Sequence, residues 1–262
     1  MKIFLGGARW PKSVLTAPPD GRFDWWPLVS FYDSKQKWAK FFLDNNKLYR
    51  GFIMDSGAFS LLGTQKHKTK GIDWDEYVER YADVVNTYGI ENFIELDLDA
   101  IIGIEEVERL RAKLERLTGR QCMPAWHKSR GWDYWLRMVS EYKYVCIGGI
   151  AACDISPREI GIFRPLLDEA KKNGCKVHGL GFTNTAKLAQ FPFYSVDSSS
   201  WNSGTRWGRL PKFAGDKIVT MNRPRGKRVV SRGENEQAVR EYSFNEWLKY
   251  CYYMNEESRQ PK

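Results

Sequence analysis

The chain has 262 residues, of which 42% are hydrophobic and 15% aromatic, enough for one sizeable core and too few to demand two domains. We therefore expect a single domain over residues 1–262. No apolar run of about 18 residues occurs, and the N-terminal sequence MKIFLGGARW lacks the pattern of a signal peptide. These features argue against a membrane partner and predict a cytoplasmic protein.

Short apolar runs alternate with segments of helical periodicity along the chain. Strands are predicted at residues 2–7, 51–56, 92–98, 121–126, 143–149, 176–182, 193–199 and 216–221. Helices are predicted at residues 34–48, 73–88, 104–118, 131–141, 158–173, 184–190 and 243–256, with none between about 200 and 215. The aromatic stretch RFDWWPLVSFYD, which contains Trp25, Trp26 and Tyr32, fits either a core cluster or a wall of a substrate site.

This alternation of apolar strands with helices favours a parallel sheet that is buried on both faces. Eight strands predict an α/β fold of the (β/α)8 TIM-barrel type, although a doubly wound open sheet would give similar local patterns. The unit after the seventh strand is irregular, and we expect a basic segment to replace or precede a helix there.

That basic segment carries most of the net charge. Residues 202–232 contain nine Lys or Arg and one acid, Asp216, and so account for +8 of the +9. A basic stripe with tryptophans suits phosphate contacts and base stacking, although a solvated loop would also be basic. The candidate nucleic-acid-binding residues are Trp201, Arg206, Trp207, Arg209, Lys212, Arg223, Arg225, Lys227 and Arg228.

The five cysteines, at positions 122, 146, 153, 175 and 251, form no CxxC pair. Their spacing therefore predicts neither a disulfide framework nor a structural zinc site. Four of the five lie in or beside apolar runs, where a cysteine is usually a small buried hydrophobe.

Three predicted strands end in acids: Asp55 in IMDSGAF, Asp97 and Asp99 in IELDLD, and Asp197 in SVDSSSW. In a parallel barrel these ends form one rim, where active sites lie. Helix capping explains one such acid but is a poorer account of three strands. Two carboxylates on one rim suit glycosyl chemistry, with one as nucleophile and the other as general acid and base.

Two other predicted strands end in glycine-rich turns, IGGIA at 147–151 and HGLGF at 178–182. Glycine lets a ligand approach the backbone closely and leaves N–H groups free to donate. Either motif alone is better explained by a tight βα turn. Together with the acids, they predict the floor of a pocket.

The ordered motifs MDSGAFS, IELDLD, CIGGIA, VHGLGFT and SVDSSSW resemble those of the tRNA-guanine transglycosylase superfamily, over residues 50–202. That family is a (β/α)8 barrel that exchanges guanine for a 7-deazaguanine through a covalent glycosyl-enzyme. The resemblance implies that Asp197 attacks C1′ and that Asp55 is the general acid and base. It also implies that Asp97 accepts hydrogen bonds from the guanine edge, which adenine cannot supply.

By the same resemblance, the backbone at Gly148 and Gly149 would donate to the purine O6, and the reaction needs no cofactor and no metal. Further candidate pocket residues are Ser56, Gly57, Asp99, Trp126, His127, Gly179 and Gly181. For His127, a helix-start or supporting role is an equal alternative.

The chain departs from the family members that act on tRNA, which usually carry a zinc site of three cysteines and a histidine near the C-terminus. Here Cys251 is the only cysteine after Cys175, and no histidine follows His178, so we expect no zinc subdomain. The short form resembles the phage and bacterial branch that inserts 7-deazaguanines such as preQ0 into DNA, a modification linked to restriction evasion.

The expected partners are therefore DNA and a free 7-deazaguanine base, and a protein that loads the DNA is left open. The alternatives are a compact tRNA-guanine transglycosylase, a glycosylase that releases a base without replacing it, and a nucleic-acid-binding barrel without turnover.

Overall fold

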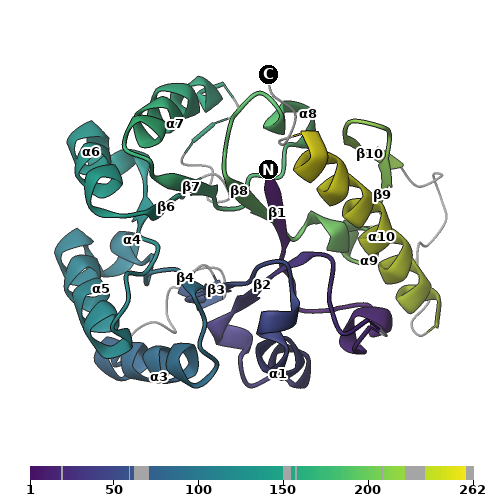
Figure 1. The fold of residues 1–262 in the computed structure, drawn as a ribbon, viewed down its shortest axis with the longest axis horizontal. Coiled ribbons are helices and arrows are strands. Elements are labelled where there is room, and N and C mark those ends of the chain that lie inside the picture. Colours follow the sequence, from purple (N-terminus) through teal and green to yellow (C-terminus); the bar gives the residue numbers. More distant parts are fainter. Residues whose placement is uncertain are drawn as a thin grey trace.

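A computed structural model describes residues 1–18, 20–58, 60–61, 71–149, 155–156, 158–207, 209–221 and 234–257. Eight parallel strands curl into a ring that is enclosed by helices (Figure 1). The strands are β1 (Lys2–Leu5), β2 (Trp26–Ser30), β3 (Ile53–Asp55), β4 (Asn92–Phe93), β5 (Ala125–Trp126), β6 (Tyr144–Ile147), β7 (Lys176–Gly179) and β8 (Ser195–Ser198).

The two edges of the sheet are joined by backbone contacts. The strand order is β4-β3-β2-β1-β8-β7-β6-β5. Beyond the ends of the ladder, a parallel bridge pairs Ile94 with Met123. The Met123 N–H donates to Phe93 O at 2.8 Å, and the Glu95 N–H donates to Met123 O at 3.1 Å. The fold is thus of the (β/α)8 barrel type, as the sequence predicts.

Helices follow most of the strands and cover the outside of the ring (Figure 1). They are α1 (Lys37–Asp44), α3 (Trp74–Thr87), α4 (Asp99–Ile102), α5 (Ile104–Thr118), α6 (Gly131–Glu141), α7 (Phe163–Lys172), α8 (Thr185–Leu188), α9 (Ser203–Trp207) and α10 (Glu234–Glu257).

Helix α3 shows how the sequence sets both the ends and the packing of these helices. Asp73 caps its N-terminus by accepting a hydrogen bond from the Glu76 N–H at 3.0 Å. Apolar residues at three- and four-residue intervals turn one face inward, and Tyr81 on that face is fully buried. Its hydroxyl lies 3.0 Å from both Met54 O and Ile94 O, which ties α3 to the ends of β3 and β4.

One of the eight barrel strands, β2, lies outside the ranges predicted from the sequence. It is formed by the aromatic stretch, where Trp25 and Trp26 are core residues and Tyr32 is 50% exposed. The segment predicted at 216–221 is a strand, β10 (Ile218–Met221), but it pairs antiparallel with β9 (Leu210–Phe213) outside the barrel. Helix α9 also lies in the 200–215 segment, where none was expected.

Cys122, Cys146, Cys175 and Cys251 are free and buried, which confirms the expectation for these four, and Cys153 lies outside the described residues. Among the described helices, none combines the length and the apolar character needed to cross a bilayer.

Candidate active site

Four carboxylates lie at the carboxyl ends of three barrel strands. Asp55 is the last residue of β3, Asp97 and Asp99 follow β4, and Asp197 is the third residue of β8. The side chains of Asp97, Asp99 and Asp197 are 17–18% exposed, so each is partly open to solvent. Because all the strands are parallel, these acids share one rim of the barrel.

Asp55 is held by the turn that follows it. Its Oδ2 accepts the N–H of Gly57 at 3.0 Å, and Gly57 has a φ of +84°, which favours glycine. Burial raises the pKa of Asp55 to about 6, opposed by the Gly57 hydrogen bond and reinforced by the negative charges of Asp197 and Asp97. A carboxyl group with this pKa can give or take a proton near neutral pH. The neighbouring Ser56 side chain is buried.

Asp197 is held by the loop that follows β7. Its Oδ1 accepts the N–H of Gly181 at 2.6 Å, and Gly181 has a φ of +65°. The Nε2 atom of His178, a fully buried residue of β7, lies 3.3 Å from the same oxygen. The carboxylate therefore has a fixed orientation while part of it stays exposed.

Asp97 forms a close pair with His127 from the loop after β5. Their Oδ1 and Nε2 atoms are 2.6 Å apart. Burial lowers the pKa of His127, but the hydrogen bond to Asp97 and the charges of Asp97 and Asp99 together raise it above its usual value. The structure thus places His127 against an expected purine-reading acid.

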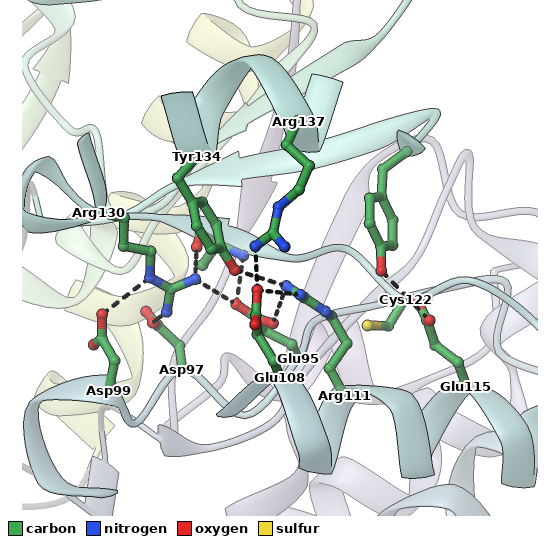
Figure 2. A network of polar contacts seen from close by, with 12 residues as sticks. Glu95, Asp97, Asp99, Glu108, Arg111, Glu115, Cys122, Arg130, Tyr134 and Arg137 are labelled. Carbon is green, nitrogen blue, oxygen red and sulfur yellow. Dashed lines mark hydrogen bonds and ion pairs between the residues drawn. The ribbon is translucent and has the colours of Figure 1, made fainter. Parts of the chain in front are cut away.

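Arg130 joins the acids that follow β4 and was not singled out from the sequence (Figure 2). Its side chain is 2% exposed. Its Nε donates to Asp99 at 3.0 Å, its Nη2 lies 3.4 Å from Asp97, and its Nη1 donates to Glu95 at 3.0 Å. Nη1 also donates to the carbonyl of Ala125. One buried guanidinium therefore fixes the positions of three carboxylates.

Glu95 anchors this network from inside the barrel wall (Figure 2). It is fully buried and accepts Arg111 Nη1 at 3.1 Å and the Ala125 N–H at 2.8 Å. Burial raises the pKa of Glu95, although Arg130 and Arg111 lower it. Tyr134 and Arg111 are joined by a hydrogen bond of 3.1 Å at the outer side of the cluster. Two guanidiniums thus compensate the buried charge of Glu95.

The N–H groups of three candidate pocket glycines, Gly57, Gly148 and Gly181, are bonded within the fold, and a fourth glycine, Gly179, packs against the core. The Gly148 N–H donates to Trp126 O at 2.8 Å, so it is not available for a purine O6. The Gly181 N–H is used by Asp197. A Cβ on Gly179 would lie 3.2 Å from both Phe193 and Val196, so this glycine serves core packing. Gly149, with a φ of +78°, is left as the candidate donor to O6.

Gly148 has another function that the sequence did not indicate. A Cβ at this position would lie 2.6 Å from Cε1 of His127, which shows that the imidazole rests directly on the glycine backbone. This close approach is possible only without a side chain at residue 148.

Three tryptophans are expected from the sequence to contact ligands, and the two whose side chains the structure describes are core residues. Trp126 is 2% exposed, and its Nε1 donates to Gly131 O at 2.8 Å. Trp201 is fully buried, its ring lies tilted against that of Trp10 with 5.0 Å between the centroids, and its Nε1 donates to Gly6 O at 2.8 Å. Neither ring is available to a base, because each is packed on all sides.

The basic segment is described only in part. Arg209 and Lys212 are exposed at the β9–β10 hairpin, which lies beside α10 (Figure 1). The side chains of Arg206 and Trp207 are outside the described set, as are residues Arg223, Arg225, Lys227 and Arg228. Two of the expected phosphate contacts are thus placed on the surface.

One group of side chains on this rim has the chemistry of metal ligands. The donor atoms of Asp97, Asp99 and His127 lie within 4.8 Å of one another. The guanidinium of Arg130 bonds to both carboxylates from a buried position and already supplies positive charge there. A divalent cation would have to compete with it. A cavity of about 350 Å³ is lined in part by Asp99, Arg130 and Tyr134.

Comparison of the chain with protein-family models and with curated proteins finds no match. The residues of this rim are therefore the basis for inferring a function.

Proposed function

We propose that the protein is a DNA-guanine transglycosylase, which replaces guanine in DNA with a 7-deazaguanine of the preQ0 type through a covalent aspartyl-deoxyribosyl intermediate. The observation that carries this proposal is the pairing of two unlike carboxylates on one rim. Asp55 has a pKa of about 6. Asp197 is oriented by Gly181 and partly exposed. The first suits proton transfer and the second suits nucleophilic attack.

In the first half-reaction, a carboxylate oxygen of Asp197 attacks C1′ of the target nucleotide. The C1′–N9 bond breaks, its electron pair goes to the guanine, and Asp55 gives its proton to the departing base. The product is an ester between Asp197 and the deoxyribose. Base exchange of this kind requires that the nucleotide be turned out of the duplex or be supplied single-stranded.

In the second half-reaction, a free 7-deazaguanine occupies the vacated site. Asp55, now a carboxylate, takes the N9 proton, and N9 attacks C1′. The ester bond breaks, and its electron pair returns to Asp197. Both half-reactions use the same two side chains, so the proton and electron balance closes without a redox partner.

Recognition of the base is assigned to Asp97. Its Oδ1 is held by His127 and Arg130, and a carboxylate has further lone pairs that can accept from N1–H and the 2-amino group of guanine. Adenine has no donor at N1, so it would leave this acid unpaired. The orientation of Asp97 by two partners supports this assignment.

The choice of DNA follows the resemblance to the short, zinc-free branch, together with the basic residues of the hairpin. Arg209 and Lys212 are exposed and could contact phosphates, which are common to DNA and RNA. A compact tRNA enzyme would use the same rim, so an assay on both polymers is needed to distinguish DNA from tRNA as the substrate.

The test is a base-exchange assay with labelled guanine on duplex DNA, single-stranded DNA and tRNA, each with an added 7-deazaguanine. Exchange into DNA supports the proposal, and exchange into tRNA alone would replace it with the tRNA enzyme. Abasic sites formed without an added base would indicate a glycosylase. Binding that survives loss of both acids, with no exchange on any polymer, would indicate a barrel without turnover.

A further inference from the structure

His178 lies beneath the proposed nucleophile and has a ring nitrogen that the fold leaves without a well-formed bond. The residue is fully buried on β7, beside β8. Its Nε2 atom has no hydrogen-bond partner of good geometry among the described residues. The Oδ1 atom of Asp197 lies 3.3 Å away. A buried polar nitrogen left unpaired is costly, so this carboxylate oxygen is its natural acceptor.

The other side of the ring is tied to a chain of hydroxyl groups. His178 Nδ1 lies 2.6 Å from Ser195 Oγ, and Ser195 Oγ is hydrogen-bonded to the hydroxyl of Tyr144. Ser195 and Tyr144 stand at the first positions of β8 and β6, at the end of the barrel opposite the acids. This row of hydrogen-bonded side chains therefore runs through the barrel interior from one end towards the nucleophile.

The chemistry of these groups selects one arrangement of protons. An ionised carboxylate only accepts hydrogen bonds, so a proton on Nε2 makes its approach to Asp197 favourable. In a neutral imidazole, Nδ1 then accepts from Ser195, and Ser195 in turn accepts from Tyr144. Burial raises the pKa of Tyr144 far above its usual value, although its bond to Ser195 lowers it, so the phenol keeps the proton it must donate. Every donor in the chain then points towards Asp197.

We propose that His178 is a positioning residue of the nucleophile: it is fixed as the Nε2–H tautomer by Ser195 and Tyr144, donates to Oδ1 of Asp197, and thereby leaves Oδ2 as the oxygen that attacks C1′. The proton arrangement follows from the geometry together with the donor and acceptor chemistry of these groups, and it does not depend on the proposed function. The consequence for catalysis rests on the proposed function.

The hydrogen bond from His178 differs in strength between the carboxylate and the ester forms of Asp197. A donor stabilises the carboxylate more than the neutral ester, because hydrogen bonds to charged groups are stronger. It therefore assists the step in which the ester breaks and the negative charge returns to Asp197. Without the donor, the ester should persist for longer relative to turnover.

The proton arrangement can be read directly by nuclear magnetic resonance on the ¹⁵N-labelled protein, because the chain has only three histidines. The His178→Gln variant identifies the signals of His178. We expect Nε2 to carry the proton, Nδ1 to be unprotonated, and the Nε2–H signal to shift in Asp197→Asn. Any other protonation pattern, or signals that do not respond to Asp197→Asn, would overturn the inference. This measurement does not depend on turnover.

The second measurement compares His178→Leu, which removes the donor, with His178→Gln, which retains an amide N–H at a similar reach. We expect kcat to fall at least ~10-fold in His178→Leu, KM for DNA to stay unchanged, and the trapped covalent fraction to rise. His178→Gln should restore part of kcat.

Equal turnover in wild type and His178→Leu would exclude the positioning role. If the wild type exchanges no base on any polymer, the proposed function fails, and the resonance measurement still decides whether His178 is the Nε2–H tautomer that donates to Asp197.

Discussion

The N–H of Gly181 lies 2.6 Å from Oδ1 of Asp197, so the backbone of the loop after β7 holds the carboxylate at the end of β8. Asp55 is held in the same manner by its own loop, through the N–H of Gly57 at 3.0 Å. Each of the two acids in the proposed reaction is therefore oriented by a glycine amide. The loops that follow the strands thus orient both acids of the proposed reaction.

The raised pKa of Asp55 predicts a cost in stability. A pKa raised to about 6 means that the folded protein binds this proton more tightly than the unfolded chain, whose carboxyl titrates near its ordinary value of 3.8. The penalty is absent at pH below about 4, grows as the pH rises towards 6, and is complete above it. Asp55→Asn should therefore stabilise the protein above pH 6, by about 1–3 kcal/mol.

Urea unfolding of Asp55→Asn and the wild type at pH 4.5 and pH 7.5 checks this difference, with exchange activity lost in the variant. The exposed acid on α7, Asp168, supplies the control variant Asp168→Asn. A stability difference for Asp55→Asn that does not grow with pH would show that the carboxyl is not strained by burial.

Arg130 is expected to be a major stabilising residue of the rim. Arg130→Met would leave Glu95 buried with one of its cations removed, at a cost of about 3–5 kcal/mol in the free energy of unfolding. Arg137→Met is the matched control, because Arg137 is half exposed and pairs with Glu108 at the surface. The control should cost at most about 1 kcal/mol. Equal losses in the two variants, measured by urea unfolding, would refute the anchoring role of Arg130.

Gly148→Ala tests the contact beneath His127. The added Cβ would meet the imidazole at 2.6 Å, so His127 must move and its hydrogen bond to Asp97 must weaken. We expect KM for the free base to rise about 10-fold, corresponding to the loss of one hydrogen bond to a charged group. Gly161→Ala is the control, because a Cβ there meets nothing within 4 Å. An unchanged KM in Gly148→Ala would separate His127 from base recognition.

The exposed basic residues of the β9–β10 hairpin predict how DNA binding depends on salt concentration. If Arg209 and Lys212 contact phosphates, the double alanine variant should bind DNA more weakly and lower the slope of log K against log salt by about 2. Lys143, just before β6, and Lys171, on α7, are exposed and supply the control pair. Filter binding at several salt concentrations measures both slopes. Equal slopes in the hairpin variant and the wild type would move the interface elsewhere.

The sequence predicts much of this fold because its local patterns agree with the tertiary structure. Seven of the eight barrel strands lie within predicted ranges, since each lies in a short apolar run, and all of these runs except that of β5 end at a glycine or an acid. The sequence does not indicate β2, because Pro27 and two adjacent tryptophans resemble an irregular aromatic cluster. The turn at Gly215 and Asp216, between two short β-prone runs, is the signal that could have identified the hairpin.

The site is harder to predict from the sequence than the fold is. Acids at strand ends are visible in the chain, because the barrel topology collects those ends on one rim. The partners of these acids are not visible, since Arg130 comes from a different βα unit than Asp99, and only the tertiary structure brings them together. The basic residues beside Trp201 favour an interface role from sequence alone, whereas its burial depends on tertiary packing with Trp10 and Phe244.

The most direct test of the central claim is exchange of labelled guanine into DNA by the wild type and by Asp197→Asn, with Asp168→Asn as the control. The proposed mechanism predicts exchange by the wild type and the control, together with a covalent protein–DNA adduct. For Asp197→Asn it predicts a loss of at least ~10³-fold and no adduct. Exchange by Asp197→Asn at the rate of the wild type would contradict the nucleophile assignment and with it the proposed mechanism.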